Sequence, residues 1–269
     1  MTTQPTWRLL ITPPRSGPEN MAIDQAIAER YPVALQPTLR FYRWSPACLS
    51  LGIAQRLERD VDQAACAALG IDIVRRQTGG RAILHDQEVT YSLVTAADDP
   101  LVRAPSIVQS YRMISQALCA GLIELGVIPE LASRPETGSA KSAACFDLPS
   151  DYEITLRGRK LIGSAQARKH GVVLQHGTLL LHADADRWAR VLRLPGDLTG
   201  AALAQRLIAL DEALGFLPTF ETVVAALVRG FEQTWQITLE PGELSAAEET
   251  RAIELVGERY ANPAWTALR

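Results

Sequence analysis

A dense polar cluster occupies one short stretch of the sequence, residues 75–86. It combines paired arginines, two adjacent glycines (Gly79 and Gly80) and a histidine, His85. Adjacent glycines let a ligand approach the backbone and leave amide groups free to bind an acyl carbonyl or a phosphate, while arginines supply fixed positive charge. From spacing alone, both a ligand-binding loop and a tight hairpin with a solvated basic rim remain open.

A cysteine in an irregular segment is the second candidate for chemistry. Cys145 lies in residues 132–150, where small, polar and charged residues follow no period, and this composition predicts a long loop. A free thiol is only a few per cent ionised at neutral pH, so a nucleophilic cysteine needs a cation or a helix N-terminus beside it. Lys160, which begins the return strand of a predicted hairpin, is a plausible cation. An inert loop cysteine is the alternative.

The other cysteines and the histidines give weaker signals. Cys66 and Cys119 fall in helical patterns, where cysteine is usually a small buried hydrophobe, and Cys48 follows a turn. The sequence has no C-x-x-C pair and no ligand set of recognisable spacing, so we expect reduced thiols and no metal. His85 and His176 could each be a base, an oxyanion donor or a satisfied core histidine.

Several elements must position these residues. A capping box of the form S-x-x-E begins at Ser16 and predicts a helix over about residues 18–30. Residues 39–44 and 49–53 have strand composition and are expected to pair with each other across Ser45-Pro46. Strands are also expected near residues 71–76 and 90–94.

The middle of the chain contains a helix and a hairpin. Apolar residues recur every three or four positions from Ile107 to Leu122, which predicts a helix that covers the sheet and ends at Gly126. Residues 152–156 alternate in polarity, and residues 160–166 can return as their partner strand after a turn at Arg157-Gly158. Two short buried strands are expected at residues 172–174 and 179–181. Beyond Trp188 the pattern is mostly helical, near residues 201–210, 221–233 and 246–260.

Composition restricts the class of protein. The chain has 269 residues, of which 47% are hydrophobic and 21% charged, and its formal net charge is −3. These proportions are typical of an ordinary globular protein, and the near balance of charge argues against nucleic acid as a ligand. No apolar run is long enough to span a membrane and the first residues lack a signal-peptide pattern, so we expect a cytoplasmic protein without membrane contact.

Three motifs in order resemble the biotin and lipoate protein ligase superfamily. They are residues 75–86 (RRQTGGRAILHD) with 88–92 (EVTYS), residues 158–166 (GRKLIGSAQ) and residues 175–180 (QHGTLL); residues 20–24 (NMAID) resemble the family's N-terminal part. The resemblance implies an α+β fold with a central mixed, largely antiparallel sheet flanked by helices and a helical C-terminal part. It further implies a single domain over residues 1–269, with a catalytic core at about 33–237 and a helical extension at 238–269.

The cysteine segment narrows the resemblance. Residues 144–153 (ACFDLPSDYE) are similar to the cysteine-bearing segment of the octanoyltransferases of bacilli and their relatives. The resemblance implies transfer of an octanoyl group from octanoyl-acyl carrier protein to a lysine of a lipoyl domain, such as that of a glycine cleavage H protein. In that group the residue matching Cys145 holds an acyl thioester, and the lysine matching Lys160 lowers the pKa of that thiol.

Such a transfer needs an apolar slot, a nucleophile at its mouth and donors for the thioester oxygen, but neither ATP nor another cofactor. Burying about six methylenes at roughly 0.8 kcal/mol each gives about 5 kcal/mol, enough to position an octanoyl chain. The residues expected to bind the substrate are Arg75, Thr78, Gly79, Gly80, His85, Gly163, Ser164, Ala165, His176 and Gly177. Arg40, Arg43, Arg56 and Arg59 are expected to be solvated surface, or to steer an acidic carrier protein.

Three alternatives remain open beside octanoyl transfer by a monomer. The first is an ATP-dependent lipoate ligase, in which Lys160 contacts an adenylate and Cys145 is incidental. The second is an amidotransferase that moves octanoyl between two lipoyl-bearing proteins through the same kind of thioester. The third is a binding module that keeps the acyl slot without turnover.

Overall fold

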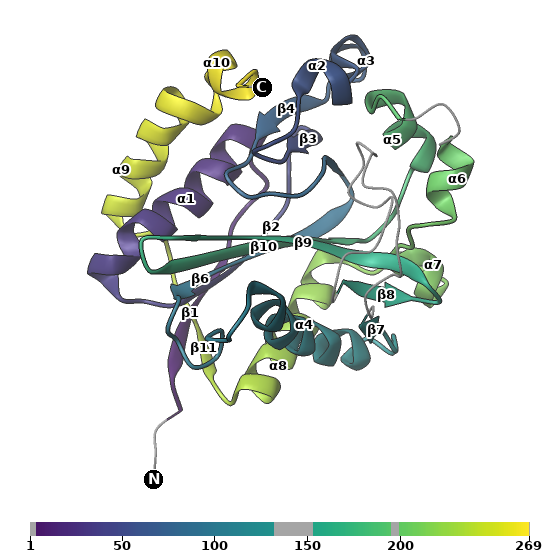
Figure 1. The fold of residues 1–269 in the computed structure, drawn as a ribbon. Helices are drawn as coiled ribbons and strands as arrows, with labels where there is room; N and C mark the ends of the chain where they lie inside the picture. Colours follow the sequence, from purple (N-terminus) through teal and green to yellow (C-terminus); the bar gives the residue numbers. More distant parts are fainter. Residues whose placement is uncertain (1–3, 132–152, 195–198, 269) are drawn as a thin grey trace.

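The computed structural model of the chain describes residues 4–131, 153–194 and 199–268. These residues form a main sheet of eight strands and a second sheet of three (Figure 1). The main sheet has the order β11 (Thr238–Pro241), β1 (Thr6–Ile11), β2 (Thr38–Tyr42), β6 (Glu88–Ala96), β10 (Val172–Leu180), β9 (Arg159–Lys169), β8 (Ile154–Leu156) and β7 (Glu130–Leu131). β1 pairs in parallel with β11 and with β2, and the other strand pairs of the main sheet are antiparallel. The expected mixed, largely antiparallel sheet is confirmed.

Helices cover both faces of the main sheet (Figure 1). α1 packs against β6 and β10 with α9 beside it, whereas α4 and α8 pack together on the opposite face. The helices are α1 (Gly17–Ala34), α2 (Leu57–Asp60), α3 (Gln63–Ala68), α4 (Ile107–Glu124), α5 (Ala185–Val191), α6 (Gly200–Ala204), α7 (Leu210–Leu214), α8 (Phe220–Trp235), α9 (Ala246–Leu255), the π-helical turn η1 (Val256–Tyr260) and α10 (Pro263–Thr266).

Local sequence signals explain the two long helices on either side of the sheet. The Ser16–Glu19 capping box is formed at the start of α1, and Ser106 caps α4 through the backbone N–H of Gln109. α4 ends just before Gly126, whose φ of 82° is a conformation that glycine adopts readily. Both predicted helices are confirmed, and α4 covers the sheet as expected.

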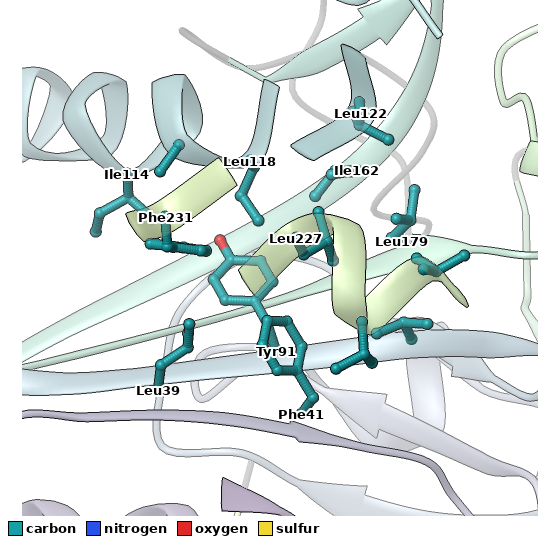
Figure 2. Packing of buried hydrophobic residues seen from close by; sticks show 14 of the residues in the cluster. Leu39, Phe41, Tyr91, Ile114, Leu118, Leu122, Ile162, Leu179, Leu227 and Phe231 are labelled. Atoms are coloured by element: carbon teal, nitrogen blue, oxygen red, sulfur yellow. The ribbon is translucent and has the colours of Figure 1, made fainter. Parts of the chain in front are cut away.

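The largest hydrophobic core lies between the sheet and the α4/α8 layer. Figure 2 shows Leu39, Phe41 and Tyr91 from the strands against Leu118 of α4 and Leu227 of α8, and all five belong to this core. The alternate residues of β2, Arg40 and Tyr42, face α1 instead, because successive side chains of a strand point to opposite faces.

The second sheet corrects two expectations about strand pairing. It has the order β4 (Asp72–Arg75), β3 (Cys48–Leu51) and β5 (Ile83–His85), and β2 lies in the main sheet. Residues 39–44 and 49–53 therefore do not pair with each other. Both β2 and β3 are buried along their whole length, so each needs neighbours within its own sheet. Residues 75–86 are likewise no hairpin, because the strands that they join flank β3.

Two further strands differ from the sequence prediction in extent. The segments expected at residues 172–174 and 179–181 form one strand, β10, which ends at Leu180, because the polar residues between them are buried and paired with both β6 and β9. The β8–β9 hairpin is confirmed, with Arg157 and Gly158 at φ values of 53° and 72° in its turn.

The C-terminal part contains a strand as well as helices. β11 adds to the edge of the main sheet beside β1, and α9 packs on α1. The helix expected over residues 201–210 is replaced by the two short helices α6 and α7. A domain boundary near residue 237 stays a prediction. Within the described residues, no helix is long and apolar enough to cross a membrane.

Candidate active site

A narrow cavity lies between the second sheet and the face of the main sheet that carries α1. The cavity is small, with a volume of about 20 Å³, which is room for about one water molecule. Residues from both sheets and from α1 line the cavity: Met21, Tyr42, Trp44, Ser50, Arg76, Ile83, His85, Thr90, Gly163, Ala165, His176 and Gly177.

The cavity brings together five of the residues expected to bind substrate. Gly163 and Ala165 of β9 line it beside His176 and Gly177 of β10, and His85 joins them from β5. His176 and Ala165 are direct partners in the β9–β10 pairing. Gly177 has no room for a side chain, because a Cβ there would lie 2.5 Å from Ser164 Oγ and 2.6 Å from Tyr91 Cε1.

His176 is held between a carboxylate and a hydroxyl. Its Nδ1 lies 3.3 Å from Asp24 Oδ2 of α1, and its Nε2 lies 2.7 Å from Thr78 Oγ1. Burial lowers the pKa of His176 below its usual value, against the opposing effect of Asp24. The neutral imidazole therefore donates from Nδ1 to Asp24 and accepts at Nε2 from Thr78.

Asp24 is fixed by two more partners. Arg40 Nη1 donates to Asp24 Oδ1 over 2.7 Å, and the Tyr42 hydroxyl donates to Oδ2 over 2.9 Å. Burial on its own raises the pKa of Asp24, but the hydrogen bond from His176 and the positive charge of Arg40 leave it below its usual value. Asp24 is therefore ionised, and the α1 side of the cavity holds a buried, paired charge.

His85 has a parallel arrangement. Its Nδ1 lies 2.7 Å from Glu88 Oε1, and its Nε2 lies 2.7 Å from Ser50 Oγ. The indole of Trp44 stacks on the imidazole with ring centroids 3.9 Å apart and planes 11° from parallel. Thr90 donates to the same oxygen of Glu88 and accepts from Trp44 Nε1 over 2.8 Å. The ring is thus fixed in both position and orientation.

The two adjacent arginines point to different places. Arg76 lines the cavity, where its Nη1 donates to Ser50 Oγ over 3.1 Å, and its Nη2 donates to the carbonyls of Gly79 and Arg81. Arg75, the residue expected at the substrate, instead donates to backbone carbonyls of the Gly52 segment and of α10, including Thr266 over 2.7 Å. Arg75 therefore ties the second sheet to the C-terminal helix.

The remaining predicted residues are not among those that line the cavity. Thr78 reaches it through its hydrogen bond to His176. Gly79 and Gly80 lie in the loop that Arg76 holds, and Gly80 has a φ of 87°. Ser164 lies on the opposite face of β9, where its hydroxyl is 2.8 Å from that of Tyr91.

A β-bulge sets the direction of Lys160. Thr155 pairs with Lys160, but the next pair is Ile154 with Ile162, so Leu161 is an extra residue in β9. Leu161 and Ile162 both pack into the α4/α8 core. The bulge thereby places Lys160 on the other face of the sheet, the face on which Gly163 and Ala165 line the cavity. Along the strand, Lys160 is about 10 Å from Gly163.

Lys160 is buried and forms an ion pair with Glu153. The side chains are 1% and 6% exposed, and the ammonium donates to Glu153 Oε1. Glu153 is separated by one residue from Thr155, the cross-strand partner of Lys160, so both lie on the same side of the hairpin. Cys145, the predicted partner of Lys160, lies outside the described residues.

The three described cysteines are poor nucleophiles. Burial raises the pKa of Cys66 to about 11 and that of Cys119 to about 12, and raises the pKa of Cys48 well above its usual value. Thiols of this kind carry almost no thiolate at neutral pH. A cysteine nucleophile in this chain would therefore be Cys145. The described residues contain no group of three or more side chains that could hold a metal ion.

Several lining residues were not anticipated from the sequence. The sequence predicts Trp44 and Ser50 only as parts of strands, Arg76 only as part of the polar cluster at residues 75–86, and Asp24 only within residues 20–24. The expectation for Arg40 was wrong, because its side chain is completely buried and pairs with Asp24. The strict alternation of β2 carries the relevant signal, since it places Arg40 and Tyr42 on one face of a strand buried on both sides.

Comparison with known proteins agrees with this geometry. The family of the lipoyl protein ligase A/B catalytic domain matches residues 16–232. The chain belongs to this family. Among curated members, "Octanoyltransferase LipM" of Moorella thermoacetica is 45% identical over 98% of both chains. "Octanoyltransferase LipM" of Kyrpidia tusciae is 42% identical over 96% of this chain and 97% of the relative.

Solved structures of the family share the whole fold. A bipartite lipoate protein ligase of Thermoplasma acidophilum, described with its E2 lipoyl domain, superposes with a TM-score of 0.81 at 27% identity over 98% of both chains. A lipoate-protein ligase A bound with ATP has the same TM-score and identity over 97% of this chain and 98% of the other. The family fold that the motifs implied is confirmed.

Proposed function

We propose that this chain is an octanoyltransferase that carries an octanoyl group as a thioester on Cys145 and passes it to a lysine of a lipoyl domain. The observation that carries the proposal is the near full-length similarity to octanoyltransferases at up to 45% identity. The donor is octanoyl-acyl carrier protein, the enzyme works as a monomer, and the location is the cytoplasm. The reaction serves the lipoylation of proteins.

The cavity supports an acyl substrate. Its α1 side offers a neutral imidazole, and its β9 wall is made of Gly163 and Ala165. Small residues let an acyl chain approach the sheet closely, and burying about six methylenes at roughly 0.8 kcal/mol each contributes about 5 kcal/mol. His85 and His176 have their rings fixed by Glu88 and Asp24. The acyl chain lies along this wall, and its carbonyl lies toward Lys160.

The chemistry proceeds in two balanced steps. The thiolate of Cys145 attacks the carbonyl of the donor thioester, the donor sulfur leaves as a thiolate, and that thiolate takes up a proton. The amine of the acceptor lysine then attacks the new thioester, loses a proton and forms the amide, while Cys145 leaves as a thiolate. The ammonium of Lys160 stabilises the thiolate in both steps, and neither step consumes ATP.

A second candidate is an ATP-dependent lipoate ligase. The likeness to a lipoate-protein ligase A bound with ATP favours it, because the superposition covers nearly both chains. In that reaction a free acid is activated as an adenylate, and Lys160 contacts the adenylate instead of a thiolate.

The test is the mass of a lipoyl domain after incubation with the enzyme. One reaction contains octanoyl-acyl carrier protein without ATP, and the other contains free octanoate with ATP. Octanoyl transfer predicts modification of the domain in the first reaction alone. Modification in the second reaction alone would establish the ligase and overturn the proposal.

A further inference from the structure

Lys160 is an unusual residue in this chain. The sequence contains three lysines, Lys141, Lys160 and Lys169, among 27 basic residues, so arginine supplies nearly all the positive charge. Of the two described lysines, Lys169 is exposed at the far end of β9, whereas Lys160 is buried. A lysine ammonium loses its proton far more readily on burial than an arginine guanidinium does.

A buried ion pair is a costly way to stabilise a fold. Removing two charges from water is unfavourable, and replacing such pairs by hydrophobic residues is often neutral or stabilising. The hairpin around Lys160 already has apolar packing, since Ile154, Leu161 and Ile162 enter the main core. Stability of the hairpin therefore does not account for a lysine and a glutamate here.

We infer that Glu153 is a positioning residue, which holds the Lys160 ammonium charged and directed toward the cavity face. Burial favours a neutral amine, and an adjacent carboxylate favours the ammonium. Only the ammonium can stabilise a thiolate electrostatically. The inference rests on the proposed function, because Lys160 acts there as the cation beside Cys145.

The bulge and the backbone around Lys160 agree with this role. Lys160 lies on the same side as its cross-strand partner Thr155 and Glu153, and the extra residue at Leu161 places that side on the cavity face. The Lys160 N–H donates to the carbonyl of Arg206, and its own carbonyl accepts from the N–H of Ile208, each near 3.0 Å. The backbone of Lys160 is therefore held in place by hydrogen bonds, and its ammonium is held by the Glu153 carboxylate.

Other charged groups near Lys160 have different partners or positions. Arg159, next in sequence, pairs with the exposed carboxylate of Glu212 on α7. Arg206 contributes its backbone carbonyl to Lys160. Glu130, on β7, is exposed, and its carbonyl accepts from the Thr155 hydroxyl over 3.3 Å. Glu153 is the carboxylate that meets the Lys160 ammonium in the described part of the hairpin.

The test is the pH dependence of alkylation at Cys145, followed by the mass of its peptide after reaction with iodoacetamide. The variants are Glu153→Gln, Lys160→Met and, as the matched control, Glu212→Gln, which removes an exposed carboxylate from the neighbouring Arg159. We expect Glu153→Gln to move the midpoint up by about one pH unit toward that of Lys160→Met, a roughly tenfold loss of rate at neutral pH. Glu212→Gln leaves the midpoint in place.

Two results would overturn the inference in different ways. If Lys160→Met moves the midpoint and Glu153→Gln does not, Glu153 has no part in activation and the proposed function stands. If Lys160→Met leaves the midpoint unchanged, the role of Lys160 in the proposed function fails and the inference fails with it.

A measurement on the wild-type chain guards against failure of Glu153→Gln to fold. With three lysines, Nζ-labelled protein gives three nitrogen resonances, and Lys160→Arg identifies the one from Lys160. The inference predicts an ammonium signal for Lys160 at neutral and mildly alkaline pH. A neutral-amine signal at neutral pH would overturn it.

Discussion

At its first residues strand β9 carries a buried ion pair, whereas three to five residues further on it carries small side chains. Near the start of β9, Lys160 forms an ion pair with Glu153. Further along the strand, Gly163 and Ala165 line the cavity beside a neutral His176. One bulge, at Leu161, puts both regions on the same face. Under the proposed function, the charge for the reaction and the wall for the acyl chain come from separate segments of one strand.

The largest effect is expected from loss of the charge. Lys160→Met should slow acylation of Cys145 by octanoyl-acyl carrier protein about 100-fold at neutral pH, because a thiol whose pKa rises by about two units loses that much thiolate. The rate is measured by quenched-flow mass spectrometry. Lys169→Met, at the exposed end of the same strand, is the control and should retain the wild-type rate. A change of less than about threefold in Lys160→Met would remove the distinction between the two regions.

A smaller effect is expected from filling the cavity. Ala165→Leu places a larger side chain on the cavity wall and should lower acylation by octanoyl about tenfold, since an overfilled pocket costs about 1–3 kcal/mol. Acylation by a butanoyl donor should be nearly unaffected, because the shorter chain does not reach this wall. Ala167→Leu makes the same change on the same strand outside this cavity. An equal loss of acylation rate for both acyl lengths would show that Ala165 does not contact the end of the octanoyl chain.

The smallest effect concerns stability and pH. The pKa of His176 is lower in the folded chain than its unfolded value of about 6.5, so the unfolded chain binds a proton first as the pH falls. The contribution of His176 is therefore complete above about pH 6.5 and declines at up to about 1.4 kcal/mol per pH unit as the pH falls toward the folded pKa. In urea unfolding, the free energy of unfolding of His176→Gln should change less with pH over this window. His170→Gln, at an exposed histidine, should retain the wild-type slope.

Asp24 titrates at a lower pH than His176, so it does not affect the pH dependence measured for His176→Gln. Its folded pKa is depressed, so its contribution is present above the unfolded value of about 3.9 and is lost as the pH falls through the folded pKa. An unchanged slope between about pH 6.5 and 5 in His176→Gln would show that the imidazole is not held neutral by burial.

Elements with local signals could be predicted from the sequence, and pairings between distant segments could not. The Ser16 capping box and the spacing from Ile107 to Leu122 are local signals, and each predicts a helix from residues that are close together in the sequence. The prediction that β2 and β3 pair with each other was wrong because both strands are buried on both faces, so their sequences do not show which neighbour each one takes.

The same reasoning applies to the site. His85, His176, Gly163 and Ala165 stand within compact motifs and could be named in advance. The groups that orient them come from far along the chain: Asp24 is 152 residues from His176, and Ser50 is 35 from His85. The placement of the Lys160–Glu153 pair on the cavity face depends on a one-residue bulge, which no period in the sequence marks.

The central claim is that Cys145 carries the octanoyl group. Its most direct test is the intact mass of the protein after incubation with octanoyl-acyl carrier protein in the absence of ATP, beside the Cys145→Ser variant. We expect the wild-type chain to gain one octanoyl group that hydroxylamine removes and that the variant lacks. No adduct on the wild-type chain, or an equal and hydroxylamine-resistant adduct on both proteins, would contradict it.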